Sequence, residues 1–202
     1  QNGAVGGLVA YNLAGSVSQS YSTATVTGIA RAGGLVGMNY NGSTISDAYA
    51  SGDVSANYAF GGLVGENSQS DINRAYATGA VTYLGGDDGG DPISYSGLSG
   101  GLVGAHFDNS TISESFASGA VSGGGDSGSG GLVGNACTGA TVSSSFWDTE
   151  TTGQSSGRSG GSLTGATGLT TAAFLDTDNF MTVAGGQGWD FETHWAPSDN
   201  MY

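Results

Sequence analysis

The chain has 202 residues and a mass of 19.8 kDa, with 40 glycines and 17 acidic against three basic residues, for a formal net charge of −14. This charge excludes nucleic acid and anionic membrane surfaces as partners, because neutralising phosphates requires clustered Lys or Arg and lysine is absent. No apolar run approaches the roughly 18 residues of a membrane-spanning helix, so no membrane insertion is expected. The regular spacing of aliphatic and aromatic residues indicates a folded domain rather than a disordered chain.

A glycine-flanked pentapeptide recurs along the chain, as GGLVA at 6–10 and as GGLVG at 33–37, 61–65, 100–104 and 130–134. Apart from one longer interval the copies lie about 28 residues apart, a period typical of solenoids. Two sets of residues, called here the aliphatic and the aromatic column, recur at nearly fixed distances after each copy of the pentapeptide. The aliphatic members are Val17, Ile45, Ile72, Ile112 and Val142, and the aromatic members are Tyr21, Tyr49, Tyr76, Phe116 and Phe146.

These short β-branched and aromatic segments, bounded by glycine or asparagine, favour strands. Three strands per repeat, stacked about 4.8 Å from their copies, would make one coil of a parallel β-helix. The sequence therefore predicts an all-β parallel β-helix (β-solenoid) of about five coils over residues 1–146, with an insertion loop at 82–99. Residues 147–202, which are rich in aromatic side chains, are predicted as a C-terminal cap that packs on the solenoid and contains a short helix.

Two polar columns fit the same register. Asn12, Asn39 and Asn67 would stack at a turn and hydrogen-bond to one another, and the next member, His106, is interpreted as an occupant of this ladder rather than a catalytic group. In the second column the members are Gln19, Asp47, Arg74, Glu114 and Ser144. Arg74 would lie between Asp47 and Glu114 as an exposed ion-pair ladder, stabilising by about 0.5 kcal/mol per pair.

The orientation of the pentapeptide stays open. Adjacent residues on a strand point to opposite faces, so either the leucine or the valine column is expected to face outward as an apolar stripe. The C-terminal cap or another molecule would cover that stripe. The aromatic column is expected to be buried, because small residues flank it on both sides, and Cys137 is expected to be a small packed residue.

The insertion contains GGDDGGDP at 85–92, which places Asp87, Asp88 and Asp91 close together. Carboxylates of this kind bind calcium, so this segment is either a calcium site or a solvated acidic turn. No cofactor is required by any other motif.

The pentapeptide, with STISDAYASGDV at 43–54 and STISESFASGAV at 110–121, resembles the GLUG-motif repeats. The segments 143–153, 166–174 and 188–195 resemble the region that closes such repeat arrays. Those repeats occur in large secreted bacterial proteins, notably filamentous-haemagglutinin-like adhesins, where they act as scaffold. The resemblance implies a secreted, extracellular location at the cell surface and transfers no catalytic residue.

The expected function is a non-enzymatic structural or adhesive β-solenoid, either an adhesin segment or a fibre-forming subunit that associates end to end. Its first coil has an open edge, which would pair with upstream repeats or with a neighbouring molecule. A glycan or a host surface is the other expected partner. The alternative is a carbohydrate-active or glycan-binding β-helix, which would require the aromatic column to face solvent.

Overall fold

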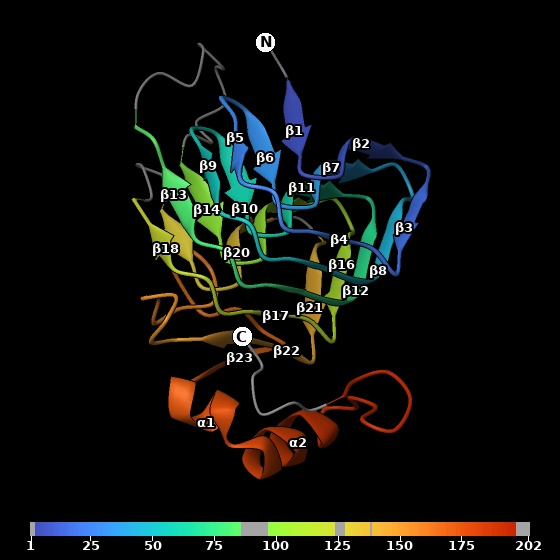
Figure 1. Cartoon of the computed structure of the whole chain (residues 1–202), viewed down its shortest axis with the longest axis vertical. Coiled ribbons are helices and arrows are strands. Elements are labelled where there is room, and N and C mark those ends of the chain that lie inside the picture. Colours follow the sequence, from blue (N-terminus) through green and yellow to red (C-terminus); the bar gives the residue numbers. More distant parts are fainter. Residues whose placement is uncertain (1–2, 86–96, 124–127, 138, 197–202) are drawn as a thin grey trace.

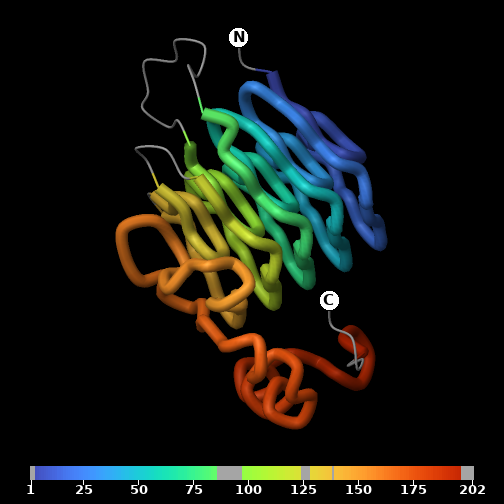
Figure 2. The backbone as a smooth tube through the Cα atoms, turned by 60° about the vertical axis from the view of Figure 1, so that its left-hand side comes forward, coloured from blue at the N-terminus to red at the C-terminus, as the bar shows by residue number. Residues whose placement is uncertain are grey.

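The computed structural model describes residues 3–85, 97–123, 128–137 and 139–196. These residues form five stacked coils of parallel strands with a small helical unit at the C-terminal end (Figure 1), which confirms the predicted parallel β-solenoid and its short C-terminal helix. Figure 2 shows the coils following one another along the rod from the N-terminal end to the C-terminal unit. No described helix is long and apolar enough to cross a bilayer.

Each of the first four coils contributes to four sheets rather than the three predicted, and the fifth coil contributes to three of these sheets. The first sheet holds β1 (Ala4–Gly6), β6 (Arg31–Gly33), β10 (Ala59–Gly61), β14 (Leu98–Gly100) and β19 (Ser129–Gly130). The second sheet holds β2 (Val9–Leu13), β7 (Val36–Tyr40), β11 (Val64–Ser68), β15 (Val103–Phe107) and β20 (Val133–Ala136). The fourth sheet holds β5 (Val26–Thr27), β9 (Val54–Ala56), β13 (Val81–Tyr83) and β18 (Val121–Ser122).

The third sheet carries the aromatic column. It is formed by β3 (Ser16–Ser18) with β4 (Tyr21–Ser22), β8 (Thr44–Ala50), β12 (Asp71–Ala77), β16 (Thr111–Ser113) with β17 (Phe116–Ala117), and β21 (Thr141–Ser143) with β22 (Ser145–Asp148). A further strand, β23 (Ala166–Leu169), extends it by pairing with β22. The predicted boundary between residues 146 and 147 therefore falls inside β22.

The fourth sheet per coil arises because the pentapeptide is a corner. In the second coil β6 ends at Gly33 and β7 begins at Val36, and the N–H groups of both Leu35 and Val36 donate to the carbonyl of Leu63 at 2.9 and 3.1 Å. Leu35 and Val36 are both fully buried in the same core cluster. The prediction that one of these columns faces outward is wrong, because the bend interrupts the alternation of a continuous strand.

A second break in alternation lies inside the third sheet. The column expected to hold the ion pairs adopts left-handed backbone in every described coil, with φ values of 47° at Gln19, 52° at Asp47, 50° at Arg74, 47° at Glu114 and 47° at Ser144. After this residue the faces exchange, so that Ala48 and Ala50 point into the core and Tyr49 points outward. The short alanines here leave room for the leucine, valine and isoleucine columns that fill the interior.

The C-terminal unit closes one end of the rod. The N–H groups of Leu132 and Val133 donate to the carbonyl of Gly157 at 3.0 and 2.9 Å, and β23 pairs with β22. The unit then continues into α1 (Thr171–Leu175), capped by the Thr170 side chain, and α2 (Thr177–Gly185), capped by Asp176. The helices pack on the outer face of the third sheet rather than on a leucine or valine stripe.

Candidate functional site

The aromatic column is the feature most open to contact with other molecules. It faces outward from the third sheet, and its exposure falls along the rod: Tyr21 is 59% exposed, Tyr49 and Tyr76 are half-buried, and Phe116 and Phe146 are buried at 3% and 0%. The expectation of a buried column is therefore wrong for Tyr21. It is right for Phe116 and Phe146, which are covered by the cap.

The rings of this aromatic ladder stack on one another. Ring centroids lie 5.0 Å apart from Tyr21 to Tyr49, 4.8 Å from Tyr49 to Tyr76 and 4.9 Å from Tyr76 to Phe116, with interplanar angles of 6°, 5° and 3°. Stacked rings cover each other's faces, so the outer surface of the ladder presents ring edges and tyrosine hydroxyls. The free face of a ring is available only at the Tyr21 end of the described ladder.

The cap shows how a partner contacts this ladder. Rings of Phe174 and Trp189 meet Phe116 at angles of 47° and 37°, and Phe180 meets Phe146 edge-on at 63°. The indole N–H of Trp189 donates to the carbonyl of Ser144 at 2.6 Å, which anchors the cap to the sheet. An aromatic-rich peptide with tilted rings is therefore complementary to the ladder, and the cap occupies only its C-terminal half.

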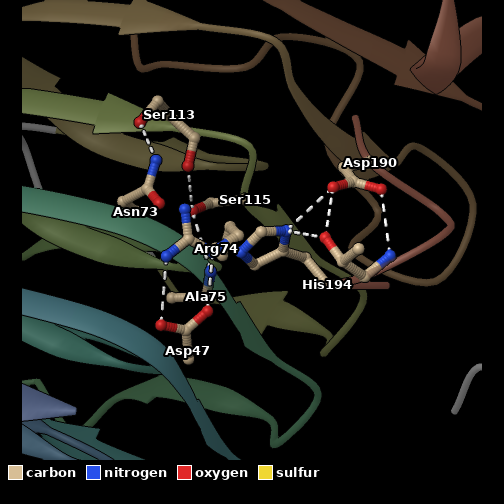
Figure 3. Close-up of polar contacts among 9 residues, drawn as sticks. Asp47, Asn73, Arg74, Ala75, Ser113, Ser115, Asp190 and His194 are labelled. Carbon is tan, nitrogen blue, oxygen red and sulfur yellow. Dashed lines mark hydrogen bonds and ion pairs between the residues drawn. The ribbon is translucent and has the colours of Figure 1, made fainter. Parts of the chain in front are cut away.

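Charged groups lie on the strands that carry the ladder, and Figure 3 shows Asp47 and Arg74 together with Asp190 and His194. The Arg74 guanidinium donates to both carboxylate oxygens of Asp47, at 2.6 and 3.1 Å, and this pair is partly exposed. The hydrogen bond from Arg74 lowers the pKa of Asp47, while the carboxylate raises the pKa of Arg74, with a weaker contribution from the charge of Glu114. The structure thus places Arg74 in direct contact with Asp47, whereas Glu114 acts on it only through its charge.

The cap adds a second polar group at the same place. His194 Nδ1 lies 3.1 Å from Asp190 Oδ2, and Asp190 Oδ1 accepts the N–H groups of Glu192 and Thr193. Hydrogen bonds from Thr193 and His194 lower the pKa of Asp190. Asp190 therefore shapes the turn that carries Trp189 and Trp195 over the ladder.

The asparagine column is an interior ladder. Asn12 Nδ2 donates to Asn39 Oδ1 at 2.8 Å, and Asn39 Nδ2 donates to Asn67 Oδ1 at 2.8 Å. In the next coil Asn67 Nδ2 lies 3.3 Å from His106 Nδ1, and His106 Nε2 lies 3.1 Å from the Thr141 carbonyl. His106 is fully buried, and burial lowers its pKa to about 4.

The proposed calcium ligands Asp87, Asp88 and Asp91 lie outside the described residues. Within the described ranges no three His, Cys, Asp or Glu side chains gather as a metal site. Cys137 is exposed, contrary to expectation, because β20 ends at Ala136 just before it. A cavity of about 300 Å³ at the closed end is lined by Arg158, Thr141 and Leu163, and Arg158 donates there to the Ser162 and Ala136 carbonyls.

One surface feature escaped sequence reasoning. Arg31 pairs with Glu66 at 2.5 Å and lies 4.8 Å above the ring of Tyr58, a contact between residues far apart in the sequence. The first coil, which was expected to have an open edge, carries exposed apolar side chains, and residues 1–30 contain no charged side chain.

Comparison with known proteins identifies the repeat. No curated protein matches the chain. The family model of the GLUG motif matches three times, at residues 1–27, 28–55 and 56–82. Each match corresponds to one coil, beginning before a strand of the first sheet and ending at the fourth. The fourth and fifth coils pair in the same register with the third and fourth. Residues 1–82 are therefore three repeats of the GLUG motif.

Proposed function

We propose that the chain is a non-enzymatic structural and adhesive segment, displayed outside a bacterial cell as a rigid rod at the cell surface. The observation that carries this proposal is the aromatic ladder, which the cap covers at Phe116 and Phe146 and which stays exposed at Tyr21. The exposed N-terminal half of this ladder is a contact surface, because exposed apolar patches of this kind mark interaction sites.

A role without catalysis fits the placement of the polar groups. The buried amides of the asparagine ladder bind one another, and the Arg74 and Asp47 side chains neutralise each other on the surface. Groups repeated once per coil provide the same contact several times along a rod, which suits adhesion to a repetitive surface.

Adhesion is tested with the labelled full chain on bacterial and epithelial cells. Binding should fall strongly in a Tyr21→Ser/Tyr49→Ser double variant, because the exposed part of the ladder is lost. Leu84→Ser/Leu175→Ser is the matched control, since both leucines are exposed elsewhere, at 52% and 50%, and this variant should bind like the wild type. Equal binding by the tyrosine variant, or confinement of the native protein to the cytoplasm, would overturn the proposal.

A glycan-binding β-helix is the second candidate, and the exposure of Tyr21 favours it. Sugars stack on the faces of aromatic rings. Because each inner ring covers its neighbour, the free face of Tyr21 is where a sugar would stack on the described ladder. A glycan array combined with a polysaccharide-degradation assay separates the candidates. Polysaccharide turnover would contradict a non-enzymatic role, whereas glycan binding that is lost in Tyr21→Ser but not in Leu175→Ser would favour this second function.

A further inference from the structure

We propose that the cavity at the closed end of the rod binds a small organic acid that carries hydroxyl groups, of the chemical class of a hexuronic acid. The Arg158 guanidinium holds the carboxylate of this ligand. The site shares no residue with the aromatic ladder, so this inference is independent of the proposed adhesive function.

The cavity lies between the fifth coil and the segment that follows β22. This segment folds over the end of the rod, where Figure 2 shows it as orange loops. Thr141 and Val142 of β21 line the cavity on the side of the coil, and Arg158, Ser162 and Leu163 line it on the side of the segment. Its volume of about 300 Å³ is at the small end of the range for ligand pockets, which suits a molecule the size of one sugar unit.

The backbone holds the Arg158 guanidinium in place. Nε donates to the carbonyl of Ser162 at 3.2 Å, and Nη1 donates to the carbonyl of Ala136 at 3.3 Å. The backbone of Arg158 also forms bridges with Val133 of β20 and with Gly161. The guanidinium is therefore fixed before a ligand arrives, which lowers the entropic cost of binding.

Arg158 is the arginine whose charge has no carboxylate partner among the described residues. The other two arginines are paired, Arg31 with Glu66 and Arg74 with Asp47. Nη2 of Arg158, which carries two N–H groups, makes no hydrogen bond to any residue that the structure describes. A planar guanidinium binds a carboxylate through parallel N–H···O bonds, so a carboxylate is the ligand group that fits these donors.

The rest of the lining matches a hydroxylated ring. Thr141 and Ser162 make their hydrogen bonds to described residues through backbone groups, which leaves their hydroxyl groups for a ligand. Thr164 adds a third hydroxyl group to the lining. Val142 and Leu163 supply apolar surface, on which the C–H groups of a sugar ring pack. A carboxylate, several hydroxyl groups and an apolar ring face are together the features of a hexuronic acid.

Isothermal titration calorimetry of the 202-residue chain with sodium galacturonate tests the proposal. We expect one site with a Kd of about 1 mM, because a single carboxylate contact supplies most of the binding free energy. Galactose, which has the same ring without the carboxylate, should not bind. Oligogalacturonate presents the same groups at the end of a polysaccharide. Its binding would assign the cavity to polysaccharide ends, whereas binding of the monosaccharide alone would assign it to the free acid.

Gly161→Asp is the most informative variant. A Cβ atom at Gly161 would lie 3.8 Å from Arg158 Nη2, with no other atom beyond its chain neighbours within 4 Å, so the new carboxylate can pair with the guanidinium in a folded protein. Galacturonate should then bind at least about tenfold more weakly. Gly161→Asn is the matched control, with nearly the same shape and no charge, and should weaken binding less than about threefold.

No binding up to about 50 mM galacturonate, galactose binding as tight as galacturonate, or equal effects of Gly161→Asp and Gly161→Asn would each overturn the proposal. Hydrogen exchange locates the site. The Val133 amide, which donates to Gly157, should exchange more slowly with galacturonate bound, while amides of β8 stay unchanged. The Tyr21→Ser/Tyr49→Ser variant should bind galacturonate like the wild type, which keeps a failure of adhesion distinct from a failure of this site.

Discussion

His106 takes the place of an asparagine in the asparagine ladder, and its two ring nitrogens do the work of the amide oxygen and nitrogen. The Thr141 carbonyl can only accept a hydrogen bond, so Nε2 carries the proton and Nδ1 is the acceptor that faces the Asn67 amide. In this neutral form Nδ1 takes the place of an asparagine Oδ1 and Nε2–H takes the place of its Nδ2–H. The imidazole continues the asparagine ladder into the fourth coil only while it is uncharged.

Acid should destabilise the protein through this residue. The unfolded chain protonates His106 near pH 6.5, whereas burial holds the folded pKa at about 4, so protons favour the unfolded state as the pH falls between these values. The free energy of unfolding should fall by about 3 kcal/mol over this window, and below pH 4 this contribution should stop changing. Urea unfolding at a series of pH values measures the loss.

The His106→Asn variant isolates this effect, because carboxylates such as Asp47 titrate equally in both proteins. The pH dependence between 6.5 and 4 should be much weaker in His106→Asn than in the wild type. His194→Asn, at the exposed histidine, is the matched control for the loss of an imidazole. If the slope of His106→Asn equals that of the wild type, His106 is not held neutral in the folded state.

The sequence predicts which residues stack on one another in successive coils, but it does not predict their backbone conformation. The recurrence of Asn12, Asn39 and Asn67 predicted which residues stack, since one register places all of them at the same point of the coil. The left-handed φ at Asp47 and Arg74 could not be predicted from the sequence, because neither residue is glycine or asparagine. The surrounding sheet imposes this conformation on them despite its steric cost.

At the scale of the elements, the pentapeptide corner depends on close contact between coils. A Cβ atom at Gly34 would lie 2.2 Å from the Gly62 carbonyl oxygen and 2.8 Å from Ala50 Cβ. Neither neighbour can move away without displacing the adjacent coil. The glycine is therefore required by the spacing of the stack, whereas its φ is ordinary.

Gly34→Ala should destabilise the protein by at least about 3 kcal/mol, because it overpacks a rigid corner. Gly28→Ala is the matched control, since its Cβ would meet only ordinary contacts, 3.4 Å from Ala32 Cβ and farther from Val5. The control should stay within about 0.5 kcal/mol of the wild type. Chemical denaturation compares the two, and a Gly34→Ala protein as stable as Gly28→Ala would show that the corner tolerates a wider spacing.

The cap should open separately from the solenoid. Trp189→Ala removes a buried ring that contacts Phe146, Phe180 and Trp195, and it also removes the hydrogen bond to Ser144. We expect the cap to lose about 3–5 kcal/mol of local stability. In native-state hydrogen exchange, amides of α2 should then exchange faster while those of β8 and β12 stay protected. Equal acceleration throughout would indicate a single cooperative unit.

The direction of side chains within these elements was the least predictable property. Strict alternation placed one member of the Leu35–Val36 pair outside, and the small residues beside the aromatic column indicated that its rings are buried. A bend at Leu35 and a left-handed residue at Asp47 each reset the alternation of the strand, and the second turns the aromatic side chains outward. Similarly, the cap was expected on an aliphatic stripe and lies on the aromatic ladder instead.

At the scale of the whole molecule, the two ends of the rod differ. The fifth coil is covered by Ser156, Gly157 and β23, whereas the strands of the first coil pair on one side only. In a solenoid each coil is stabilised by its neighbours, so within this 202-residue chain the first coil, which pairs on one side only, should be the weakest unit.

Hydrogen exchange should therefore show a gradient along this 202-residue chain. Amides of β2 should exchange at least about 100-fold faster than the corresponding amides of β11, because the open coil unfolds locally at lower cost. Uniform protection from β2 to β11 would contradict local unfolding of the first coil.

The connection from the fourth sheet to the first differs in length between coils. It runs from Ala56 to Ala59 after the second coil and from Tyr83 to Leu98 after the third, yet Gly61 and Gly100 remain in register across β10 and β14. Length at this corner is therefore independent of the stacking on either side. A guest peptide grafted between β9 and β10 should therefore be displayed from the side of an unchanged rod, one coil away from the natural insertion. A second guest peptide grafted between β13 and β14 would then lie next to the first.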